Sequence, residues 1–189
     1  MAAVTGSVRN GVDTEQMYAT LDLITAQPEL ARFQFRASNR WVGGAHNRST
    51  IQGFYGAGQE DASRPEPFEL DAGEPAVLLG MNTGPNPVEY LLHALAACLT
   101  ISIVYVAAAR KVNLTSVEST LAGELDARGA FGLSDEVRNG FEHISASFRV
   151  TGEASEEKLR EVVERAKARS AVFDIVTNGV PVTLEVTAR

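Results

Sequence analysis

The sequence predicts an α+β protein in which antiparallel sheets surround one long buried helix. Two observations support this prediction. Residues 91–109 form an apolar run that contains no Asp, Glu, Lys or Arg and in which His93 is the only basic side chain, and a helix that is apolar on every side is normally buried on every side. Segments with alternating apolar residues lie before and after this run, and strands do not alternate with helices as they do in a doubly wound parallel sheet.

The individual elements follow from periodicity and from turn and capping residues. Before the long helix we predict a short helix at 13–26, then strands at 33–40 and 49–54 joined through the turn Gly43-Gly44, and then a loop at 56–75 with one short strand near 68–70. After the long helix we predict strands at 117–125 and 144–150, separated by a loop around 128–139. A helix from the N-cap Ser155 to about Arg169 and a final strand at 180–186 complete the predicted elements. We expect residues 1–31 to form an N-terminal extension that contains the short helix, and residues 32–189 to form the main domain.

Capping residues mark the start of the long helix. Asn86 is a favourable N-cap, Pro87 suits the first helical position, and Glu89 places a carboxylate near the positive end of the helix dipole. The apolar run is nearly long enough to span a bilayer. Its many alanines, together with His93 and Thr100, make it only mildly hydrophobic. We therefore expect no membrane span, and a helix that lies in a domain core or in a dimer interface.

Composition narrows the classes of function. The 189 residues are enough for one domain with a sizeable core. The chain has 24 acidic and 17 basic residues, and its net charge of -7 disfavours a nucleic-acid binder. Neither a nucleotide-binding glycine motif nor a His or Cys cluster with metal-ligand spacing is present, so we expect no cofactor and no metal. The first residues lack the apolar run of a signal peptide, which predicts a cytoplasmic protein.

Cys98 is the single cysteine of the chain and lies within the long apolar run. One interpretation is a small buried hydrophobic residue, which is how a free cysteine usually behaves. The other is a redox nucleophile, which needs a nearby cation or helix dipole to favour the thiolate. The residue pattern alone leaves both interpretations open.

The start of the long helix also carries a family pattern. Residues 86–99, with the sequence NPVEYLLHALAACL, resemble the central-helix motif of the OsmC/Ohr family of osmotically inducible and organic-hydroperoxide-resistance proteins. Cys98 falls at the position of the peroxidatic cysteine of that family. The resemblance extends upstream to Arg40-Trp41-Val42-Gly43-Gly44 and downstream through residues 170–174 to the final predicted strand.

The resemblance implies an OsmC-like fold, in which two chains intertwine into a homodimer with the central helices packed between two sheets. It also implies that the thiolate attacks an organic hydroperoxide and becomes a sulfenic acid, which a second cysteine captures as a disulfide. Ser170 stands where the family has this resolving cysteine. The chain therefore resembles a branch of the family that lacks the resolving cysteine and needs an external thiol reductant.

The resemblance implies four candidate catalytic residues, Cys98, Arg40, Arg48 and Glu89. The family draws an arginine that stabilises the thiolate from between its first strands, where Arg40 and Arg48 lie, and His46 is a weaker third candidate. The peroxidases of the family have a glutamate directly after the helix-opening proline. That position is Val88 here, and Glu89 follows one place later. The helical repeat puts Glu89 on the opposite face from Cys98, so the two could meet only across a dimer.

Two functions follow from these observations. The first is the thiol-dependent reduction of organic hydroperoxides by a single peroxidatic cysteine, Cys98, which an external thiol resolves. The alternative is a non-catalytic OsmC-like protein that binds a small apolar ligand at the dimer interface, with Cys98 structural or redox-sensing. A third and weaker possibility is another thiol-dependent reaction of Cys98 with an electrophile. Neither nucleic acid nor a membrane is an expected partner.

Overall fold

The computed structural model describes residues 8–188 and divides them into two compact units. The first unit comprises residues 13–91. The second comprises residues 8–12 together with residues 92–188. The N-terminal extension predicted for residues 1–31 lies partly outside the described residues.

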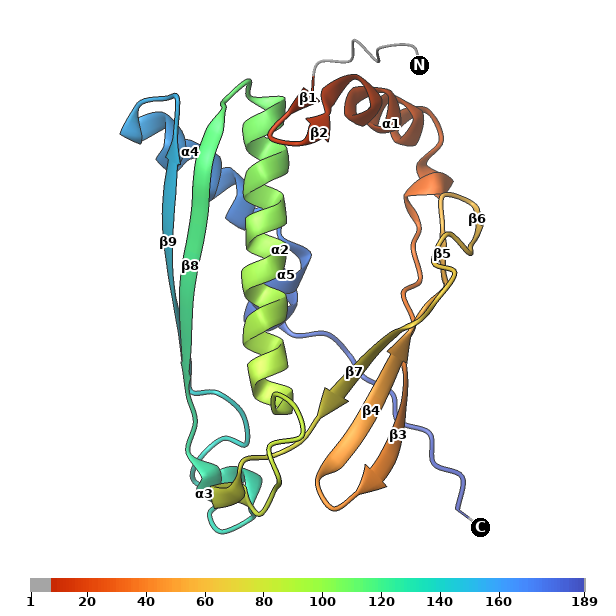
Figure 1. The fold of residues 1–189 in the computed structure, drawn as a ribbon, viewed down its shortest axis with the longest axis vertical. Coiled ribbons are helices and arrows are strands. Elements are labelled where there is room, and N and C mark those ends of the chain that lie inside the picture. Colours follow the sequence, from red (N-terminus) through yellow and green to blue (C-terminus); the bar gives the residue numbers. More distant parts are fainter. Residues whose placement is uncertain (1–7, 189) are drawn as a thin grey trace. The chain divides into compact units, whose positions relative to one another are not determined.

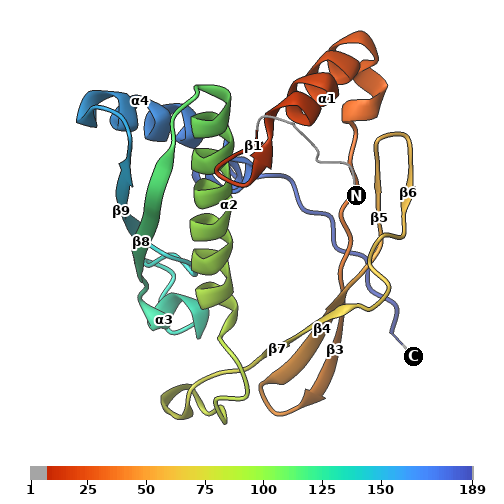
Figure 2. The ribbon, with the colours of Figure 1, turned by 45° about the horizontal axis from the view of Figure 1, so that its top comes forward.

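The first unit begins with a helix and then forms small antiparallel sheets. Helix α1 (Thr14–Ala26) starts where it was predicted, because the Asp13 side chain accepts a hydrogen bond from the Gln16 N–H at 3.0 Å. Figures 1 and 2 show the strands that follow. After the 3₁₀ turn η1 (Pro28–Ala31) come β3 (Ser38–Gly43), β4 (His46–Ile51), β5 (Phe54–Gly56), β6 (Gln59–Asp61) and β7 (Phe68–Ala72), with η2 (Ala76–Leu78) after them.

The order of strands in this unit differs in part from the prediction. The sheet has the order β3-β4-β7, and β5 pairs with β6 and, through an isolated bridge at Tyr55, with Gln34. The turn at Gly43-Gly44 is confirmed, with Gly44 at φ 57°. The bounds predicted for the first two strands, 33–40 and 49–54, are wrong. The strands lie at 38–43 and 46–51, because the polar residues 46–48 pair with β3 and extend β4 toward the turn. Residues 56–75, predicted as loop with one short strand, contain β6 and β7.

Helix α2 (Pro87–Ala109) crosses the boundary between the units at Leu91 and Leu92. Its start is the predicted one. The Asn86 N–H donates to Glu89 Oε2 at 2.8 Å, and the Glu89 N–H donates to Asn86 Oδ1 at 2.9 Å. This reciprocal pair satisfies two backbone donors that the helix itself leaves without partners.

The second unit packs helices against one long antiparallel ladder. Strand β8 (Leu114–Glu124) pairs with β9 (His143–Gly152), and α3 (Ala127–Ala130) lies in the connection between them. Figure 1 shows α2 beside this ladder. Helix α4 (Glu156–Lys167) has the predicted N-cap Ser155. The buried core of this unit consists of Ile103, Val106, Ala107, Val112, Val162 and Ala166.

A short hairpin joins residues 8–12 to the rest of this second unit. Strands β1 (Val8–Arg9) and β2 (Val12–Asp13) turn through Asn10 and Gly11, both at positive φ. The Asn10 side chain donates to Val112 O at 2.9 Å and accepts from the Leu114 N–H at 2.9 Å. Because one amide satisfies a backbone acceptor and a backbone donor, the hairpin is fixed to the segment between α2 and β8.

Two predictions about the second unit are wrong for the single chain. Residues 180–186 form no strand in it, and Val180, Val182, Leu184 and Val186 are all exposed. The long helix is not buried on all sides, because Ile101 and Tyr105 are each 53% exposed. A strand needs a neighbour for its backbone hydrogen bonds, and an apolar helix face needs a covering surface. The single chain supplies neither at these places.

Length and apolar composition alone would allow α2 to cross a membrane. It is the one such helix within residues 8–188. The core helix of a soluble protein meets the same criterion, so this is weak support for a membrane span.

Candidate functional site

Cys98 lies in the middle of α2, in the second unit, and is half-buried. Its sulfur accepts a hydrogen bond from Ser170 Oγ at 3.1 Å. Ser170 is only 2% exposed and is the N-cap of helix α5 (Ala171–Asn178). The structure therefore joins the single thiol of the chain to a buried hydroxyl at the start of a helix.

Sequence analysis missed helix α5. Its signals are short but present: Ser170 is a favoured N-cap residue, and Gly179 follows the last helical residue with φ 69°. The Ser170 Oγ accepts from the Phe173 N–H at 3.3 Å. This capping bond brings the Ser170 hydroxyl to the first turn of α5, where the positive end of the helix dipole lies.

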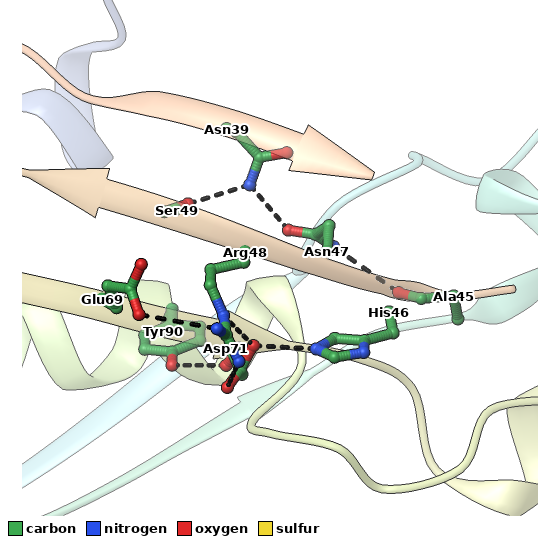
Figure 3. A network of polar contacts seen from close by, with 9 residues as sticks. All are labelled: Asn39, Ala45, His46, Asn47, Arg48, Ser49, Glu69, Asp71 and Tyr90. Carbon is green, nitrogen blue, oxygen red and sulfur yellow. Dashed lines mark hydrogen bonds and ion pairs between the residues drawn. The ribbon is translucent and has the colours of Figure 1, made fainter. Parts of the chain in front are cut away.

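The first unit holds a separate polar network on one face of the β3-β4-β7 sheet (Figure 3). Arg48 binds Asp71 in a bidentate manner, through Nε to Oδ1 and Nη2 to Oδ2, both at 2.8 Å. His46 Nε2 lies 2.8 Å from Asp71 Oδ1, and Arg48 Nη1 lies 3.5 Å from Glu69 Oε2. The Tyr90 hydroxyl donates to the backbone oxygen of Asp71 at 2.7 Å. Sequence analysis missed Asp71 and Glu69, because the register of β4 against β7 cannot be seen in the sequence.

Electrostatics in this network favour the ionised carboxylate. Hydrogen bonds from Arg48 and then from His46 lower the pKa of Asp71 to about 2. The same contact with Asp71 raises the pKa of Arg48. A carboxylate that receives charged donors is held in its ionised form, so Asp71 and Arg48 form a closed ion pair.

Arg40 is the contrasting arginine. It lies directly opposite Arg48 in the β3-β4 register, so both side chains are on the same face of the sheet. Arg40 is exposed, and within residues 8–188 its side chain has no hydrogen-bond or ion-pair partner. Its charge is available for an external group, whereas the charge of Arg48 is compensated by Asp71.

Glu89 has a structural role in this chain, since its carboxylate accepts the Asn86 N–H at the start of α2. Val88, at the position next to the helix-opening proline, supplies no carboxylate. Thus the structure brings Cys98 together with Ser170, and Arg40 together with Arg48, and these two groups belong to different units. The approach of an arginine to Cys98 and a catalytic role for Glu89 stay predictions.

Several solved structures resemble this chain in fold. An OsmC-like protein from Mycoplasma pneumoniae matches with a TM-score of 0.58 at 13% identity, over 77% of this chain and 88% of that chain. An organic hydroperoxide resistance protein OsmC from Legionella pneumophila matches with a TM-score of 0.53 at 19% identity, over 77% of this chain and 91% of that chain. An OsmC-like protein of unknown function from Vibrio cholerae has a TM-score of 0.54 at 11% identity, over 75% of this chain and 92% of that chain.

A comparison with curated protein sequences finds no match. At these identities the structural likeness establishes the fold, which is mixed α+β with antiparallel sheets. The family pattern of OsmC-like proteins matches residues 80–185, more than half of the chain, and this range includes both Cys98 and Ser170. The chain therefore belongs to the OsmC-like protein family.

Proposed function

We propose that this protein reduces organic hydroperoxides with Cys98 as its single nucleophile, and that an external thiol restores the cysteine. The observation that carries the proposal is the hydrogen bond from the buried Ser170 hydroxyl to Cys98 Sγ, on the helix where the family has its peroxidatic cysteine. A donor aimed at sulfur favours the thiolate, which is the reactive form. The name of the Legionella structure, an organic hydroperoxide resistance protein, agrees with this substrate class.

The chemistry balances with one cysteine and two molecules of thiol. The Cys98 thiolate attacks the terminal oxygen of the hydroperoxide, the O–O bond breaks, and the alkoxide leaves as an alcohol after it gains a proton. The sulfur is oxidised to sulfenic acid. One external thiol then displaces water to form a mixed disulfide with Cys98, and a second thiol releases the disulfide product and restores Cys98. Ser170 excludes the intrachain disulfide, since the chain has no second cysteine.

The two candidate arginines differ in how much of their positive charge is available to an anion. A thiolate is stabilised by an uncompensated positive charge. Arg48 already binds Asp71 through two hydrogen bonds and lies near Glu69, so little of its charge is available to a further anion. Arg40 lies on the same face without a partner among the described residues.

A second copy of the chain is part of the proposal. The exposed side of α2 carries Ile101 and Tyr105, and residues 180–186 present alternating apolar side chains without a strand partner. A homodimer would cover both surfaces and would explain why the sequence has the pattern of a buried helix and of a paired strand.

One observation favours the alternative of a non-catalytic protein that binds a small apolar ligand at the dimer interface. Val88 replaces the carboxylate that the family pattern has beside the helix-opening proline, and Glu89 is engaged in capping α2. In this alternative Cys98 is structural or redox-sensing. The retained thiol with its buried hydroxyl donor favours the enzyme, because packing alone does not require a donor aimed at sulfur.

The experiment is to follow the consumption of tert-butyl hydroperoxide and of hydrogen peroxide with dithiothreitol as the external thiol. Wild type and Cys98→Ser are compared, and Ser102→Ala, another polar change on α2, is the matched control. The proposal predicts turnover that favours the organic hydroperoxide, is abolished in Cys98→Ser and persists in Ser102→Ala. Turnover by Cys98→Ser equal to that of wild type, or no turnover by wild type, would overturn it.

A further inference from the structure

The contact between Ser170 and Cys98 has a defined direction. Ser170 Oγ accepts the Phe173 N–H at 3.3 Å, and Cys98 Sγ lies 3.1 Å from the same oxygen. A hydroxyl has one proton to donate. The Phe173 N–H uses one lone pair of this oxygen, and the hydroxyl donates its proton to the sulfur of Cys98.

The chemistry of the acceptor shows which state of Cys98 suits this arrangement. The sulfur of a neutral thiol is a weak acceptor, whereas hydrogen bonds to an anion are shorter and stronger. Ser170 is buried, so little water competes for its proton. The hydrogen bond from a buried donor to the sulfur group is therefore stronger when that group is anionic, either as the thiolate or as the sulfenate.

We propose that Ser170 is a positioning residue that holds the anionic forms of Cys98, first the thiolate before the attack and then the sulfenate after it. This inference rests on the proposed function and deepens it by giving a role to the residue at the resolving position. A hydroxyl forms no bond to the oxidised sulfur. Ser170 thus keeps the sulfenate oriented until an external thiol attacks the sulfur, and the sulfenate oxygen leaves as water after it takes up protons.

The chain offers a matched pair of caps for the test. Ser155 and Ser170 are both N-cap serines whose Oγ accepts a backbone N–H, at 3.3 Å in each case, but only Ser170 contacts Cys98. Ser155→Ala removes a helix cap and leaves the thiol contact intact. Ser170→Ala removes both, and Ser170→Thr retains the hydroxyl.

The measurement is the rate of alkylation of Cys98 by iodoacetamide as a function of pH, which needs no hydroperoxide. We expect Ser170→Ala to slow the alkylation of Cys98 at neutral pH by about threefold or more, because the anionic sulfur loses a hydrogen-bond donor. Ser170→Thr should restore the wild-type profile, and Ser155→Ala should leave it unchanged. A wild-type profile for Ser170→Ala, or an equal slowing for Ser155→Ala, would overturn the inference.

If Ser170→Ala leaves a cavity and does not fold, Ser170→Cys tests the same contact. With a thiol at position 170, one equivalent of hydroperoxide should oxidise Cys98 and then form an intrachain disulfide, visible as resistance of both thiols to alkylation. A folded Ser170→Cys protein that forms no such disulfide would contradict the contact. If wild type consumes no hydroperoxide while the alkylation profile still depends on Ser170, the proposed function fails and the role of Ser170 in holding the thiolate stands.

Discussion

The two units of this chain differ in how much apolar surface each buries within itself. The second unit has a buried apolar core to which α2, α4 and the segment before β8 contribute. The first unit has small sheets, and of the buried apolar side chains among residues 8–188 only Ala72 belongs to it. Large apolar residues of the first unit, such as Trp41 at 74% exposed, face outward.

This difference shows which part of the molecule is complete within one chain. Burial of apolar surface is the main favourable term in folding, so the second unit is expected to supply most of the stability of the single chain. The first unit has charged and polar pairs, which contribute less when exposed. The candidate thiol lies in the well-packed unit, whereas the candidate arginines lie in the other.

The sharpest test of the comparison uses two isoleucines of α2. Ile103 is 1% exposed in the core, whereas Ile101 is 53% exposed. Ile103→Ala should lower the free energy of unfolding by about 2 to 5 kcal/mol, because it leaves a cavity. Ile101→Ala should have a much smaller effect on the isolated chain, and an effect that grows with protein concentration in a dimer. Urea unfolding at two concentrations measures both, and equal losses independent of concentration would contradict the account.

The C-terminal segment tests whether a second copy completes the fold. Leu184→Asp should weaken self-association by about tenfold or more, because an unpaired charge would be buried on the apolar side of the segment. Thr183→Asp places the same charge on the other side and should have a smaller effect. Analytical ultracentrifugation gives the dissociation constants. A wild-type protein that is monomeric at all concentrations tested would contradict the proposal that a second copy covers this segment.

A smaller effect is expected at the start of α2. Asn86→Ala removes the Oδ1 atom that accepts the Glu89 N–H and leaves the hydrogen bond from the backbone N–H of residue 86 to Glu89 in place, so it should cost about 1 kcal/mol of stability. Glu89→Gln keeps an acceptor for the Asn86 N–H and should cost less. Thermal unfolding measures the difference. If Asn86→Ala retains full stability while hydroperoxide turnover falls, the structural role assigned to this pair is wrong.

The smallest effect concerns the charged network of the first unit. The pKa of Asp71 is lowered from 3.8 to about 2, so its contribution to stability is present above about pH 4 and is lost as the pH falls through about 2. Arg48→Gln should raise the midpoint for the Asp71 carboxyl toward its ordinary value, and Arg40→Gln should leave it nearly unchanged. Carbon-detected NMR titration follows this carboxyl directly. An equal displacement in both variants would contradict the separate roles of the two arginines.

Much of the fold could be predicted from local signals. Helices α1, α2 and α4 begin at Asp13, Asn86 and Ser155, whose side chains satisfy backbone donors in the way the sequence suggests. The ladder of β8 and β9 follows period-two patterning. Helix α5 was missed because it is short and its apolar residues adjoin a segment with the pattern of a strand.

The candidate site was harder to predict, because it depends on long-range contacts. The family resemblance predicted the role of Cys98. Its contact with Ser170 depends on α5, and this helix is too short for its apolar periodicity to predict it. The pairing of Arg48 with Asp71 depends on strand register, which is set by the whole sheet rather than by neighbouring residues. The sequence placed both arginines between the first strands, and the structure places them within β3 and β4.

The most direct test of the central claim is the mass of the intact protein after exposure to one equivalent of organic hydroperoxide without added thiol. The account predicts that one oxygen atom is added to Cys98, that dimedone traps the product as the adduct of a sulfenic acid, and that Cys98→Ser gains no oxygen at this position. A Cys98 thiol that stays unmodified while the hydroperoxide remains unconsumed would contradict the account and leave ligand binding as the function of this scaffold.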